Sequence, residues 1–144
     1  MSVGDELPDE HHIARLCKGS SLDEEGNPTG ASFMLRDGES YLSVNWLELV
    51  DPDNRENALA LLKPVLAKKM TITGSWRLAT LNVGQCKATV ADATGDEIII
   101  RVAHEPIETE TISDPSHSGI HGYSNEETVV EKLAAAVTST CPAK

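Results

Sequence analysis

Residues 40–47 read Ser-Tyr-Leu-Ser-Val-Asn-Trp-Leu, so apolar and polar side chains alternate along the stretch. A period of two is typical of a β-strand with one buried face. The apolar face of the expected strand carries Leu42, Val44 and Trp46. The polar face carries Tyr41, Ser43 and Asn45. Because a helix signal follows almost at once, the stretch predicts a fold in which strands and helices pack together.

Upstream of this strand, His12–Cys17 and residues 32–35 are predicted to be short strands. Arg36-Asp37-Gly38-Glu39 separates residues 32–35 from the strand at 40–47. Asp-Gly between apolar runs is a strong hairpin signal. We therefore expect residues 32–47 to form an antiparallel hairpin.

The helix downstream has a clear start and a clear apolar stripe. Asp53 and Glu56 have the spacing of a capping box, and Asp51-Pro52 offers a slightly earlier start. The stripe consists of Leu59, Leu62 and Leu66, and Lys68 and Lys69 suit the negative end of the helix dipole. Pro64 removes a backbone donor, so a kink or a break into two short helices is expected there.

Residues 76–103 are predicted to form a three-stranded antiparallel meander. The expected strands span residues 76–83, 86–91 and 97–103, with turns at Gly84 and at residues 93–96. Ile98, Ile99 and Ile100 are consecutive, as in a central strand that is buried on both faces.

The C-terminal third changes character after residue 103. Residues 104–124 lack a periodic pattern, and we interpret them as a long loop. Ser124 and Glu127 then form a second capping box before a final helix. Residues 1–10 and 139–144 are expected to be loose tails. The chain is thus predicted to be a single α+β domain, residues 1–144, with a mostly antiparallel five- to six-stranded sheet and two helices on one face.

The charge balance narrows the range of partners. The 144 residues contain 23 Asp and Glu against 12 Lys and Arg, a formal net charge of −11. Such a surface repels nucleic acid and anionic membranes and attracts a basic protein or a cation. Three widely spaced cysteines, an acidic N-terminus and the lack of an apolar leader favour a cytoplasmic protein with reduced thiols.

Two histidines, His117 and His121, lie four residues apart after Asp114-Pro115. Asp-Pro favours the start of a helix, and one helical turn would place both imidazoles on one face. Such a pair can hold a divalent metal such as Zn²⁺, with Asp114, His104 or His12 as a third ligand, or can work as an acid or base. The alternative is an ordered loop that merely contains two histidines.

A second candidate site involves His12 and Arg15 on the first strand. With Tyr41 and Ser43 from a later strand, these side chains could clamp the phosphates of a nucleotide. Against this, His12 and Arg15 point to opposite faces of a regular strand. No phosphate-binding loop and no known nucleophile motif occurs.

Three functional hypotheses follow. The first is a small acidic adaptor without catalysis, which binds a basic protein surface through residues 104–124. The second is a small enzyme whose site contains His117 and His121, with His12, Arg15 or His104 as further candidates. This enzyme would use a metal or acid–base chemistry, and in one version it would act on nucleotides. The third is an acidic inhibitor or antitoxin-like protein that occupies a basic groove.

Overall fold

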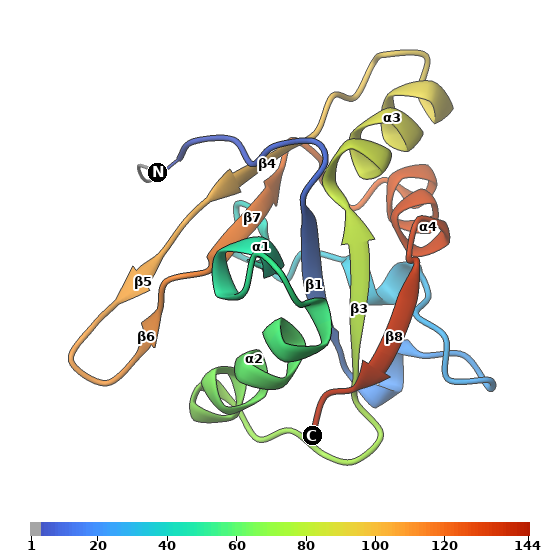
Figure 1. Ribbon diagram of the computed structural model, residues 1–144. Helices are drawn as coiled ribbons and strands as arrows, with labels where there is room; N and C mark the ends of the chain where they lie inside the picture. The colour runs from blue at the N-terminus through green and yellow to red at the C-terminus, as the bar shows by residue number, and fades with distance from the viewer. Residues whose placement is uncertain (1–3) are drawn as a thin grey trace.

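The computed structural model describes residues 4–144, and its main feature is a six-stranded antiparallel sheet (Figure 1). The strands follow the order β4-β7-β2-β1-β3-β8. Their bounds are β1 His12–Cys17, β2 Leu42–Trp46, β3 Arg77–Asn82, β4 Arg101–His104, β7 His117–His121 and β8 Ser139–Pro142. A separate hairpin consists of β5 Ile107–Glu108 and β6 Ser113–Asp114. The predicted α+β class and antiparallel sheet are confirmed.

Helices cover both faces of the sheet rather than one. The α-helices are α1 Leu47–Val50, α2 Arg55–Lys69, α3 Val83–Ala93 and α4 Glu127–Ala135. One core cluster joins buried side chains of α1 and α2 to Ala14 and Leu78. The other joins α3 and α4 to Ile13 and Leu81, the residues that alternate with Ala14 and Leu78. The period-two pattern of the strands thus supplies an apolar surface to each helix pair.

The central strands follow the predicted pattern, and their pairing explains where the sheet opens. β1 pairs with β3 over its whole length, from His12 opposite Asn82 to Cys17 opposite Arg77. Its ladder with β2 has only two pairs, Ile13 with Trp46 and Ala14 with Asn45. The two strands therefore part beyond Ala14, in the middle of the sheet.

The predicted strand at residues 86–91 is wrong, because this segment belongs to helix α3. The Asn82 side chain accepts a hydrogen bond from the backbone N–H of Gln85 and caps the helix. The buried residues Val83, Cys86 and Val90 have helical spacing. The alternation of residues 86–91 fits a strand, but the helix starts just before them, at Val83.

The predicted hairpin at residues 32–47 is also wrong in its first strand. Residues 30–33 form the 3₁₀-helix η2 (Gly30–Phe33), whose first turn is capped by Thr29, and a second one, η1, spans Gly19–Ser21. Phe33 is fully buried. Gly38 does adopt the left-handed conformation that its turn requires, with φ of 85°. The turn forms as predicted, but the strand expected before it, at residues 32–35, does not.

The segment from residue 97 to 124 differs most from the prediction. β4 begins only at Arg101, and Ile99 is 61% exposed instead of buried in a central strand. Residues 104–124 contain β5, β6 and β7, and β7 lies between β4 and β2. The predicted helical turn at residues 115–121 is therefore a strand. A strand that is buried on both faces does not need to alternate apolar and polar residues. Because β7 also contains the small residues Ser118 and Gly119, it does not have the apolar pattern of a strand.

Helix α2 and the chain ends show smaller differences. Helix α2 continues through Pro64 without a break, and its cap is Asn54 rather than Asp53. Near the N-terminus, Gly4 and Leu7 donate backbone hydrogen bonds to His104 and Val102 of β4; residues 1–3 of the predicted tail lie outside the described residues. Residues 139–142 form β8 instead of a loose tail. No helix within residues 4–144 is long and apolar enough to cross a membrane.

Candidate functional site

A cleft of about 660 Å³ opens where β1 and β2 part. The polar side of β2 and His117 of β7 contribute to its wall, together with the C-terminal end of α2. The segment that contains η1 and η2 lines another side, and Ile107 and Ile112 of the β5–β6 hairpin line a third. This volume lies in the range of typical small-molecule sites.

The cleft is cationic although the chain is acidic. Four basic side chains line it: Arg15, Lys18, Arg36 and Lys69. Glu39 is the single acidic residue among its described lining residues. A chain with almost twice as many acidic as basic residues would not be expected to concentrate basic groups here by chance. Arg36 pairs with Glu39 and Lys69 with Asp114, so within residues 4–144 the ion pairs leave Arg15 and Lys18 as the lining cations without a paired carboxylate, and these two favour an anion.

Arg15 is the most unusual of these cations. Its Nε donates to the backbone carbonyl of Ser32 at 2.7 Å, and Nη1 donates to the carbonyl of Ser43 at 3.0 Å. Within residues 4–144 no carboxylate forms an ion pair with it. Burial lowers the pKa of Arg15, and the nearby Cys17, Tyr123 and Glu39 only partly offset this effect. The guanidinium is held in place without having its charge neutralised by direct pairing.

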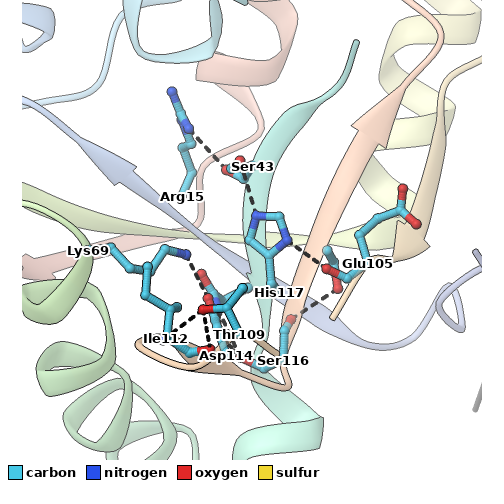
Figure 2. Close-up of polar contacts among 11 residues, drawn as sticks. Arg15, Ser43, Lys69, Glu105, Thr109, Ile112, Asp114, Ser116 and His117 are labelled. Atoms are coloured by element: carbon cyan, nitrogen blue, oxygen red, sulfur yellow. Dashed lines mark hydrogen bonds and ion pairs between the residues drawn. The ribbon is translucent and has the colours of Figure 1, made fainter. Parts of the chain in front are cut away.

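A serine and a histidine meet across β2 and β7 beside Arg15. His117 Nδ1 lies 2.7 Å from the backbone carbonyl of Glu105, and Nε2 lies 3.1 Å from the Ser43 hydroxyl. Figure 2 shows Ser43 between the Arg15 guanidinium and the His117 ring. His117 is 3% exposed, whereas Ser43 is only half-buried and lines the cleft.

The electrostatics of His117 favour the neutral ring. Burial lowers its pKa, and the positive charge of Lys69 acts in the same direction. The hydrogen bond to the Glu105 carbonyl and the charges of Asp114 and Glu105 oppose this shift without overcoming it. A neutral imidazole at pH 7 can accept a proton, as a general base must.

A buried ion pair forms another wall of the site. Lys69 Nζ at the end of α2 donates to Asp114 Oδ2 at 2.7 Å. The other carboxylate oxygen accepts from the Asn45 amide at 2.8 Å. Asn45 also donates to the Ser116 hydroxyl at 2.9 Å. This network ties α2, β2 and β6 together, and Figure 2 shows the Lys69 side chain directed at Asp114.

Tyr41 lies between the two histidines of β7. Its ring centroid is 5.9 Å from that of His117 and 4.8 Å from that of His121. Gly119 makes this possible, because a Cβ there would collide with the Tyr41 ring. His117 and His121 share a face, but they do so four residues apart on a strand, with Gly119 and the Tyr41 ring between them, and not on the predicted helical turn.

The structure does not bring the predicted metal ligands together. Asp114 is engaged by Lys69 and Asn45, and His121 Nε2 lies 3.2 Å from a Glu105 carboxylate oxygen without a hydrogen-bond alignment. Across residues 4–144, no group of three or more His, Cys, Asp or Glu side chains is placed to hold a metal ion.

The other predicted site histidines lie elsewhere. His12 pairs with Glu48 of α1 at 2.6 Å. His104 approaches the Pro115 carbonyl with Nε2 at 2.7 Å and contacts the Trp46 ring edge-on. Of the proposed phosphate clamp, Arg15, Tyr41 and Ser43 do meet in the cleft, whereas His12 does not.

Sequence reasoning missed the contributions of Lys69, Asn45 and the 18–36 segment. Asn45 was placed on the polar face of its strand, and this alternation was the available signal for a polar wall. The partners of that wall come from segments distant in sequence, which no local pattern reveals. Comparison with known proteins adds no assignment: no protein-family model, curated protein or solved structure matches the chain.

Proposed function

We propose that the protein binds a small organic anion with an apolar body in the cleft between β1 and β2. The observation that carries this proposal is Arg15, a half-buried guanidinium that two backbone carbonyls hold in place and no described carboxylate neutralises. A bound phosphate or carboxylate would supply the missing negative charge and accept charge-assisted hydrogen bonds.

The apolar part of the ligand is inferred from the other lining residues. Met34 and Met70, which are 46% and 36% exposed, both line the cleft. Ile107 and Ile112 of the hairpin add branched side chains to the same lining. Exposed methionines are typical of surfaces that adapt to an apolar ligand. An inorganic ion alone would leave this surface uncovered.

This proposal is closer to the nucleotide-handling version of the small-enzyme hypothesis than to the adaptor or inhibitor hypotheses. The adaptor was expected to bind through residues 104–124, but residues 116–120 are buried in the sheet. The acidic exterior then has a simple role, because it keeps the protein soluble while the cleft attracts anions.

Binding can be tested with 8-anilinonaphthalene-1-sulfonate, a fluorescent anion with an apolar body. We expect one saturable site per folded chain, with competition by decanoate and weaker competition by inorganic phosphate. Arg15→Gln should weaken the affinity about 10- to 100-fold, since a charge-assisted hydrogen bond contributes about 1.5–3 kcal/mol.

The matched control is Arg101→Gln, which removes an exposed arginine of β4 outside the cleft lining. It should leave the affinity unchanged, and circular dichroism should show that both variants remain folded. Equal affinities for Arg15→Gln and the native protein, or the absence of a saturable site, would disprove the proposal.

A further inference from the structure

We propose that Ser43 and His117 form a nucleophile–base pair that hydrolyses carboxylic esters bearing a negative charge. The charge preference rests on the proposed function of the cleft, whereas the nucleophile–base pair rests on its own geometry. Ser43 lies on β2 and His117 on β7, in strands paired through Ser43 opposite Gly119.

The hydrogen bonds decide which ring nitrogen acts as the base. The Glu105 carbonyl can only accept, so the His117 nitrogen 2.7 Å from it, Nδ1, carries a proton. In the neutral ring, Nε2 then has a free lone pair. Ser43 Oγ lies 3.1 Å from Nε2 and donates its proton to it. A hydroxyl, a base and a third group that orients the base are the parts of an activated nucleophile.

The surroundings suit this role on both sides. His117 is almost fully buried and reaches the cleft only as part of its wall, while Ser43 is half-buried and lines the cleft where a substrate would lie. The described charged groups that act on His117 are Lys69 of α2, Asp114 of β6 and Glu105 beside β4.

The reaction proceeds in two balanced steps. In the first, Ser43 Oγ bonds to the ester carbonyl carbon as its proton passes to His117 Nε2; the C–O bond to the alcohol then breaks, and the alcohol leaves with that proton. In the second, a water molecule gives a proton to His117 and attacks the acyl carbon. The bond to Ser43 breaks, Oγ recovers the proton, and the acid departs.

The cations of the cleft supply the remaining chemistry. Arg15, which donates to the Ser43 carbonyl, and Lys69 both line the cleft that contains Ser43, and Lys69 is paired with Asp114, so Arg15 supplies the unpaired positive charge near a carbonyl oxygen that becomes negative there. The same charges attract a substrate that is itself an anion. Both effects predict discrimination between an anionic ester and its neutral counterpart.

The direct test is covalent labelling with a fluorophosphonate, which reacts with activated serines regardless of substrate. Peptide mapping should locate the label on Ser43, and Ser43→Ala should abolish labelling. Ser139 of β8 provides the matched control, because it is an exposed serine outside the cleft lining. Ser139→Ala should label at the native rate. No label on Ser43 in the folded native protein would disprove the pair.

A second test measures hydrolysis of 4-acetoxybenzoate against its neutral methyl ester. The native protein should favour the anion and form an acetyl-Ser43 intermediate detectable by mass spectrometry. His117→Gln should slow hydrolysis about 100-fold or more, the usual contribution of a general base. The native rate should already be near its plateau at pH 7, because burial holds the pKa of His117 below its ordinary 6.5.

The two proposals fail in different ways. If the fluorescent anion binds but Ser43 is never labelled, the nucleophile–base pair is disproved and the binding function stands. If Ser43 is labelled but both esters react equally and Arg15→Gln changes nothing, the pair stands and the anion site is disproved.

Discussion

Asp114→Asn should destabilise the protein more than most single substitutions, because it breaks a buried ion pair. Asp114 is 0% exposed, and the Lys69 side chain that contacts it at 2.7 Å is 15% exposed. Asparagine keeps one oxygen for the Asn45 amide but leaves the Lys69 ammonium without its counter-charge. Breaking a buried pair by removing one partner costs about 3–5 kcal/mol.

That loss is large against the total stability of a domain of this size, roughly 7–20 kcal/mol. It corresponds to a fall in melting temperature of roughly 6–20 °C. Urea unfolding followed by circular dichroism at pH 7 would measure the free energy of unfolding, and thermal melts would supply the second estimate.

The double variant Lys69→Met with Asp114→Asn isolates the pairing energy. Removing both charges should recover most of the lost stability, because methionine occupies a similar volume and needs no counter-charge. A loss below about 1 kcal/mol for Asp114→Asn alone would refute the reasoning, since that is the value of a solvated surface pair.

Two further predictions concern other parts of the sheet. Burial raises the pKa of Glu48, but hydrogen bonds donated by His12 outweigh burial and hold the pKa below its ordinary 4.5. The carboxylate therefore adds stability above pH 4.5 that is lost as the pH falls through the lowered pKa; Glu48→Gln should flatten this acid dependence in urea unfolding between about pH 3 and pH 6, and an unchanged slope would contradict the assignment. Gly119→Ala should cost about 1–3 kcal/mol in thermal melts, because the added methyl group collides with the Tyr41 ring. When Gly119→Ala is made in a protein that already carries Tyr41→Ala, the cost should mostly disappear. A cost as large as in the native protein would place the strain elsewhere.

The sequence predicted the parts of the fold that local patterns determine. The strand at residues 40–47 was recognisable because its residues alternate: the apolar ones face the core and the polar ones line the cleft. Helix α2 was recognisable from its leucines and from the lysines of its last turn, although its cap is Asn54 and not the predicted Asp53. Helix α3 was not, because Cys86, Ala88 and Val90 alternate as in a strand, while Val83, Cys86 and Val90 repeat with helical spacing. Short apolar runs fit both periods, and only packing decides between them.

The candidate site was predictable only in fragments. The polar residues of the first strand and of residues 40–47 suggest a common site for Arg15, Tyr41 and Ser43, and these three residues do line one cleft. The sequence also indicates His117, but its spacing points to His121 along the chain, whereas its hydrogen-bond partner is Ser43 across the sheet. Strand pairing at a separation of 74 residues leaves no local signal, so the pair could not be read from the sequence.

The order of the strands has a consequence during synthesis. β1, β2 and β3 emerge first, but β2 lacks its second neighbour until β7 has been made. Because Ser43 and His117 meet only across that late pairing, an unfinished chain would carry the serine without its base. Contacts this distant also form slowly during folding. Any activity of the pair would thus begin only when the sheet is closed, so the nascent protein would be inert until β7 has left the ribosome.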